Sequence, residues 1–136
     1  MITRKINLIV WHCSDSDHAH HNDIMVIDQW HKERGFNSES GIHCGYHFFI
    51  QRSGKIQEGR PISEKGAHAK GYNSNSIGIC LHGKETFTEA QFESLILLTK
   101  TLLKMLPESK IIGHCDVSNK TCPNFKVDPI REKVLS

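Results

Sequence analysis

The sequence contains no long run of apolar residues. Its amino terminus leads into only a handful of apolar residues before Trp11 and His12. A signal peptide or a membrane span requires a much longer apolar segment. We therefore expect a protein that is cytoplasmic when it is synthesised and that does not insert into a membrane.

An excess of charge of one sign is also lacking. The 17 basic and 15 acidic residues leave a formal net charge of +2, and no basic run is long enough to form an evident patch. Proteins that bind nucleic acid or an anionic membrane surface usually carry such a patch. The composition therefore argues against nucleic acid as a partner, and the function has to be inferred from candidate site residues.

The cysteines form no disulfide framework. There are five of them, an odd number, and they are scattered without regular spacing. Reduced thiols are therefore expected. We assign no functional role to four of these thiols, those of Cys13, Cys44, Cys80 and Cys115.

The chain has the length and composition of one domain. With 136 residues and 38% apolar content it can bury one sizeable core, and it shows no repeats or linkers. We expect a single domain over residues 1–136. Strands are predicted at residues 6–10, 46–51, 55–58, 77–81 and 110–113, and helices at 23–34, from the capping box of Thr88 and Gln91 to Pro107, and from Asp128-Pro129 onward. Because strands alternate with helices, the predicted fold is α/β, with a central mixed β-sheet flanked by helices.

One stretch after the last predicted strand has the composition of half a metal site. His114 lies eight residues before Cys122, and Lys120 lies between them. An imidazole and a thiolate together suit Zn²⁺, and two protein ligands leave room for a third and for an activatable water. The third ligand is predicted to be His12, because it also follows an apolar strand. Sheets of this class place ligand sites beyond the carboxyl ends of their strands, so His12 and His114 converge if their strands are neighbours.

Five phrases of the sequence resemble those of a known family. In chain order they are Val10-Trp11-His12-Cys13-Ser14, Trp30 to Phe36, Gly45-Tyr46-His47-Phe48, His68 to Ile79, and Gly113-His114 through Cys122-Pro123. Together they resemble the zinc-dependent N-acetylmuramoyl-L-alanine amidases of the phage-lysozyme type, also called type 2 amidases. These share a fold with peptidoglycan recognition proteins. The resemblance extends from about residue 6 to 130, and the phrases occur in the family's order.

The resemblance implies a reaction and a set of roles. The reaction is hydrolysis of the amide between N-acetylmuramic acid and L-alanine in peptidoglycan or in muropeptides. His12, His114 and Cys122 are the implied Zn²⁺ ligands. Tyr46 is expected to orient water or to donate to the tetrahedral centre, and Lys120 to stabilise the oxyanion. His68 is expected to contact the saccharide or the peptide. We further expect a monomer that acts on the cell wall after release.

Three other readings remain open at this stage. A peptidoglycan-binding module without catalysis would keep the cleft and lose a metal ligand. A cysteine hydrolase would use Cys13 or Cys115 with a histidine, although neither thiol follows an evident helix start that would lower its pKa. A purely structural zinc site usually has a fourth protein ligand, and the motif offers three. Polar residues around His18, His20 and His21 are interpreted as a surface loop without a role.

Overall fold

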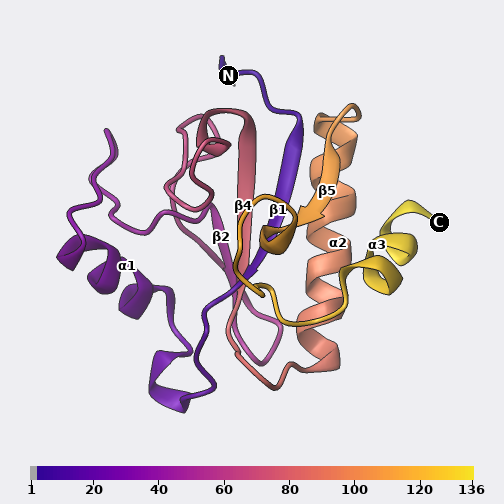
Figure 1. Ribbon diagram of the computed structural model, residues 1–136, viewed down its shortest axis with the longest axis horizontal. Coiled ribbons are helices and arrows are strands. Elements are labelled where there is room, and N and C mark those ends of the chain that lie inside the picture. The colour runs from indigo at the N-terminus through magenta and orange to yellow at the C-terminus, as the bar shows by residue number, and fades with distance from the viewer. Residues whose placement is uncertain (1–2) are drawn as a thin grey trace.

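Strand β1 (Leu8–Cys13) runs between two parallel neighbours, β4 (Ser76–Leu81) and β5 (Lys110–Gly113), in the computed structural model (Figure 1). The structure describes residues 3–136. The full sheet has five strands in the order β3-β2-β4-β1-β5, with β2 (Phe48–Ile50) parallel to β4 and β3 (Ile56–Glu58) antiparallel at the edge. The sheet is therefore mixed, and the predicted fold class is confirmed.

Three α-helices surround this sheet within residues 3–136, and each has a local reason to begin where it does. Their bounds are α1 (Ile24–Glu33), α2 (Glu89–Met105) and α3 (Val127–Leu135). The carboxylate of Asp23 accepts the N–H of Met25 at the start of α1, and Thr88 and Gln91 form the predicted capping box of α2. Gly35, at a φ of +83°, ends α1 in the left-handed conformation that favours glycine.

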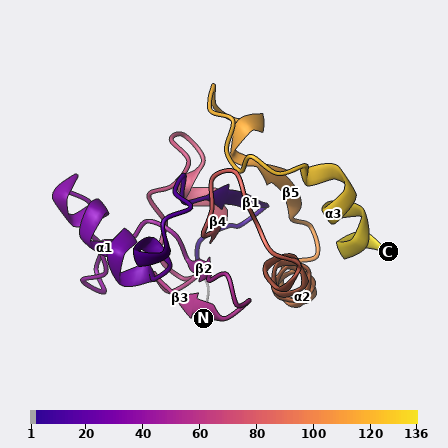
Figure 2. The same cartoon turned by 90° about the horizontal axis from the view of Figure 1, so that it is seen from below.

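Alternation along the strands separates two faces of the sheet. Odd-numbered residues such as Ile9 and Trp11 of β1 point toward α2, where they join a core that also contains Leu95 and Leu102. Figure 2, seen from below, shows α2 on one side of the sheet and the loop after β5 on the other. Each fully buried leucine of this core contributes about 1.5 to 3 kcal/mol through the hydrophobic effect.

The opposite face carries smaller and more polar residues. Ile24 and Ile27 of α1 pack there against Phe49 and Cys80. The same face of β1 and β4 presents His12 and Ser76, which are 1% and 0% exposed. A buried histidine and a buried serine need hydrogen-bond partners or a ligand, so this face is where a site is expected.

Several predicted boundaries differ from those observed. β1 begins at Leu8 and ends at Cys13, whereas the sequence predicts a strand over residues 6–10. β2 begins at Phe48, so Tyr46, the predicted first residue of that strand, lies before it. Helix α3 begins at Val127 with Lys126 as its cap residue, and so Asp128 does not cap it. This earlier start is compatible with Pro129, because the proline still lies in the first turn. Backbone N–H groups there have no helical partner, so the missing N–H of proline costs nothing. No helix among the described residues is both long and apolar enough to cross a bilayer.

Candidate active site and metal centre

The ends of β1 and β5 bring two histidines together. His12 is the second-last residue of β1, and His114 directly follows β5. Their ring centroids lie 4.5 Å apart. The parallel pairing of β1 with β5 produces this closeness, because parallel strands end at the same edge of a sheet.

Cys122 completes a group of three possible metal ligands. One ligand atom from each of His12, His114 and Cys122 lies within 4.8 Å of the other two. The Sγ of Cys122 is 3.8 Å from Nδ1 of His12, which shows that Nδ1 is the ring nitrogen facing the thiol. No other such group occurs among residues 3–136, and the histidines around His20 do not form one.

The donor set of this group suits Zn²⁺. Two imidazoles and one thiolate are borderline and soft ligands, and a three-residue set leaves a coordination position for water or substrate. The neighbouring Cys13 thiol and burial raise the pKa of Cys122. A thiolate at this position therefore needs a cation beside it, and a divalent metal would supply one.

The pKa of His12 favours the neutral form that binds metals. Burial lowers this pKa well below 6.5, and the electrostatic influence of the nearby His68, His114 and Lys120 side chains lowers it further. The pKa of His114 is lowered by burial and by Lys120. Both imidazoles consequently keep a lone pair available for a metal at neutral pH.

Two of the three candidate ligands, His114 and Cys122, line a cleft of about 970 Å³. Its lining includes the predicted residues His68, Tyr46 and Lys120 together with His114 and Cys122. The structure thus brings every sequence-predicted site residue into one place. His12 is buried and does not line the cleft itself. Its ring lies against that of Tyr46, which does line the cleft.

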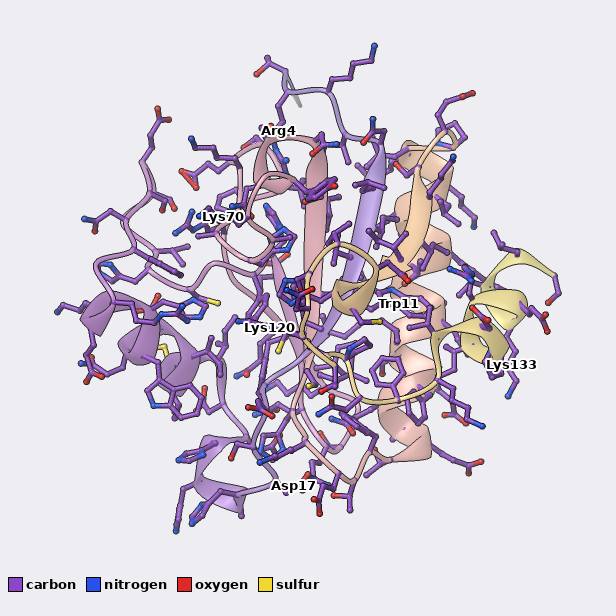
Figure 3. All side chains as sticks on the ribbon, in the orientation of Figure 1. Arg4, Trp11, Asp17, Lys70, Lys120 and Lys133 are labelled. Carbon is purple, nitrogen blue, oxygen red and sulfur yellow. The ribbon has the colours of Figure 1, made fainter. Side chains whose placement is uncertain are left out.

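Tyr46 and Lys120 both line the cleft but differ in burial. The ring centroid of Tyr46 is 5.0 Å from that of His12, and burial raises the pKa of the phenol well above 10, so the hydroxyl stays protonated. Lys120 is exposed at the rim and carries a positive charge that reaches His12 and His114. Figure 3 labels Lys120 beside the loop that crosses in front of the sheet.

His68 lies deeper than a simple substrate contact would require. Its side chain is only 9% exposed, and burial lowers its pKa well below 6.5. The Nδ1 atom is 2.8 Å from Nε2 of His12, and the Nε2 atom is 3.1 Å from the hydroxyl of Ser76. Both ring nitrogens are therefore engaged within the protein, and a substrate would meet the ring through its carbon atoms.

Other residues line the cleft without having been predicted. Trp30, Arg34 and Phe36 come from the end of α1 and the turn after it, and Asn73 comes from the loop before β4. The guanidinium of Arg34 lies 5.0 Å from the centroid of the Phe36 ring. The available signals were the family-like phrases from Trp30 to Phe36 and from His68 to Ile79, which by themselves assign no role to any of these side chains.

The cysteine-hydrolase reading receives no support from the geometry. Cys115 is exposed and lines a separate groove beside Phe125 and Arg131. The main chain and thiol of Cys13 face Cys122, which is itself a candidate ligand. The geometry instead favours a metal-dependent hydrolase, because three side chains that could hold one metal ion lie together at a cleft.

Comparison with known proteins identifies the family within this class. Residues 2–125 match the family model described as N-acetylmuramoyl-L-alanine amidase, and the chain belongs to this family. The endolysin of Enterobacteria phage T3 is 41% identical over 130 residues, which cover 90% of this chain and 83% of that protein. The chain is accordingly an N-acetylmuramoyl-L-alanine amidase.

Solved structures support the same family. The N-acetylmuramoyl-L-alanine amidase LysC from Clostridium intestinale matches with a TM-score of 0.86 and 34% identity, over 99% of this chain and 89% of that one. The ectodomain complex of peptidoglycan recognition proteins LCa and LCx, solved with bound tracheal cytotoxin, matches with a TM-score of 0.73 and 26% identity, over 89% and 77% of the two chains. The predicted family and its shared fold are thus confirmed.

Proposed function

We propose that the amidase activity of this chain depends on zinc held by His12, His114 and Cys122. The scissile bond is the amide between the lactyl group of N-acetylmuramic acid and L-alanine, in peptidoglycan or in muropeptides. The observation that carries the proposal is the set of three ligand atoms within 4.8 Å of one another beneath the cleft. Zinc bound there would polarise the carbonyl group of the substrate and would lower the pKa of a bound water to roughly 7.

Two nearby side chains are suited to stabilising and orienting the reacting groups. The exposed ammonium of Lys120 projects from the cleft rim, where it is available to negative charge growing on the attacked carbonyl oxygen. The phenol of Tyr46 remains a hydrogen-bond donor at neutral pH because burial raises its pKa. It is placed beside His12, so it orients either the attacking water or the tetrahedral centre. The ring of His68 contributes a buried contact at the wall of the cleft for the sugar or the peptide.

The setting of this activity is also a proposal. We infer that the substrate is the cell wall or its soluble fragments, because similar proteins include an endolysin and peptidoglycan recognition proteins solved with bound tracheal cytotoxin. The chain is expected to act as a monomer and to reach the wall after release from the cytoplasm. It is not expected to bind nucleic acid.

A non-catalytic binding module is the second candidate, because the peptidoglycan recognition protein complex contains a bound ligand. Zinc content and hydrolysis of a muramyl-L-alanine peptide, measured on the same preparation, separate the two. The proposal predicts about one zinc per chain, loss of hydrolysis on chelation and recovery on adding zinc. Peptide binding without hydrolysis in the zinc-loaded protein would support the binding module instead. Hydrolysis unaffected by chelation would contradict the zinc centre.

A further inference from the structure

The ring nitrogen of His12 that does not face Cys122 contacts a second histidine. This Nε2 atom lies 2.8 Å from Nδ1 of His68, and the two rings are nearly perpendicular, at 88°. Nε2 of His68 in turn lies 3.1 Å from Oγ of Ser76, which is fully buried. These contacts form a continuous chain from Nδ1 of His12, which faces Cys122, to the start of β4.

Hydrogen-bond directions follow from this order. A metal at Nδ1 of His12 requires a lone pair there, so the ring hydrogen must be on Nε2. That N–H can only donate to Nδ1 of His68, which must accept. The remaining hydrogen of a neutral His68 is then on Nε2, where it donates to the hydroxyl oxygen of Ser76.

We propose that His68 is a positioning residue for the metal centre, which fixes the tautomer and the ring orientation of His12, and that Ser76 fixes His68. This proposal rests on the proposed zinc site and adds an assignment to it. Metal-bound histidines commonly donate their second N–H to an outer partner, and such partners raise metal affinity. Here the partner is another imidazole.

The ring of His68 packs directly against two glycines of the surrounding backbone. A Cβ atom added to Gly66 or Gly78 would lie 2.6 or 2.7 Å from Cδ2 of His68, too close for any side chain. The side-chain oxygen of Asn73 accepts the N–H groups of both His68 and Ala69, each at 2.8 Å. The ring is thus held against β4 by two glycines and by its own loop, as a positioning role requires.

The first test measures metal affinity in variants of His68. His68→Phe keeps a flat ring but removes the acceptor, whereas His68→Asn places an amide oxygen at the position of Nδ1, where it can accept from His12. Zinc affinity is measured by competition with a chelator of known affinity, and the visible spectrum of the cobalt-substituted protein reports the ligand geometry. We expect zinc affinity to fall about 10- to 100-fold in His68→Phe, with an altered cobalt spectrum, and to recover largely in His68→Asn. Thermal unfolding of the zinc-free proteins checks that both variants fold.

A second test needs no substitution. Nitrogen-15 NMR of the histidine rings distinguishes the two neutral tautomers in the wild-type protein. The proposal requires the hydrogen on Nε2 in both His12 and His68. A hydrogen on Nδ1 of His68 would overturn it, and so would wild-type zinc affinity in a folded His68→Phe protein. Wild-type protein that binds no zinc would instead contradict the zinc centre itself, and the positioning role would fail with it.

Discussion

The main-chain N–H of Cys13 donates a hydrogen bond to the Sγ of Cys122 at 3.1 Å, although 109 residues separate them. This bond joins the end of β1 to the loop after β5. It directs the sulfur toward the ring of His12, the neighbour of Cys13 in the same strand. An N–H donor of this kind stabilises a thiolate, which is the form that binds a metal.

Replacing Cys122 with serine is expected to remove most of the bound zinc while the chain stays folded. A serine hydroxyl is protonated at neutral pH, so it contributes neither the charge nor the soft donor that zinc favours. Zinc is measured in the purified variant by elemental analysis, beside a Cys115→Ser control whose exposed thiol lies in a different groove. One zinc per chain with full activity in Cys122→Ser would remove this residue from the ligand set.

Replacing Lys120 with alanine is expected to separate catalysis from metal binding. An ammonium has no lone pair for a metal, so zinc content should stay unchanged while turnover falls roughly 10²- to 10³-fold, or about 2.7 to 4 kcal/mol, as for loss of one oxyanion donor. The control is Lys133→Ala on α3, far from the cleft (Figure 3). Turnover within twofold of wild type would exclude the oxyanion role, whereas parallel loss of zinc would indicate that Lys120 supports the ligand loop.

The core face of α2 can be tested with two leucines of the same helix. Leu102 is 3% exposed and belongs to the core beneath the sheet, whereas Leu97 is 66% exposed. Leu102→Ala should lower the free energy of unfolding by about 2 to 5 kcal/mol, and Leu97→Ala should change it by less than about 0.5 kcal/mol. Urea unfolding of both variants provides the comparison. Equal midpoints would show that the face is assigned incorrectly.

His47 is expected to make the fold sensitive to acid. Its Nδ1 atom accepts the N–H of Gly78 at 3.0 Å, and its Nε2 atom lies 2.8 Å from the carbonyl oxygen of Glu64, so the neutral form satisfies both. Burial lowers the pKa of His47 from 6.5 to about 4. Between these values the unfolded chain binds a proton that the folded chain does not, so stability is lost as the pH falls.

The slope of this loss is at most about 1.4 kcal/mol per pH unit for this group, between pH 6.5 and 4. His47→Gln can retain one acceptor and one donor but does not titrate. Its free energy of unfolding, measured by urea titration at several pH values, should therefore depend less on pH in this range. An unchanged pH dependence would assign the acid sensitivity to other groups, such as His31, whose pKa burial also lowers to about 4.

Local signals predicted the ends of α1 and the start of α2 better than the ends of strand β1. Thr88 with Gln91 and Asp23 with Gly35 mark helix ends through hydrogen bonds and backbone conformation that depend on nearby residues alone. Residues 11–13 of β1, which lie beyond the predicted strand, are in the sheet because they pair with β4 and, at Trp11, also with β5. Both partner strands lie far away in the sequence. A pattern read along one strand contains no information about those partners.

The same distinction applies to the site. The proximity of His12, His114 and Cys122 was predictable because strand ends and ligand types are visible in the sequence. The contact between His68 and His12 was not, since it depends on the glycines of the neighbouring strand and loop that leave room for the ring. The cleft residues on α1 were missed for a similar reason, because the orientation of a helix over a sheet is a tertiary property.

The interior position of β1 also sets the order in which the protein can form. Its neighbours in the sheet, β4 and β5, begin only at residues 76 and 110, so the first strand of the chain waits for most of the sequence before it is paired on both sides. Such distant pairings slow folding. During synthesis, the centre that joins His12 to Cys122 cannot assemble until the ribosome has released residue 122. With the proposed zinc centre, a chain truncated before residue 122 is therefore expected to lack amidase activity.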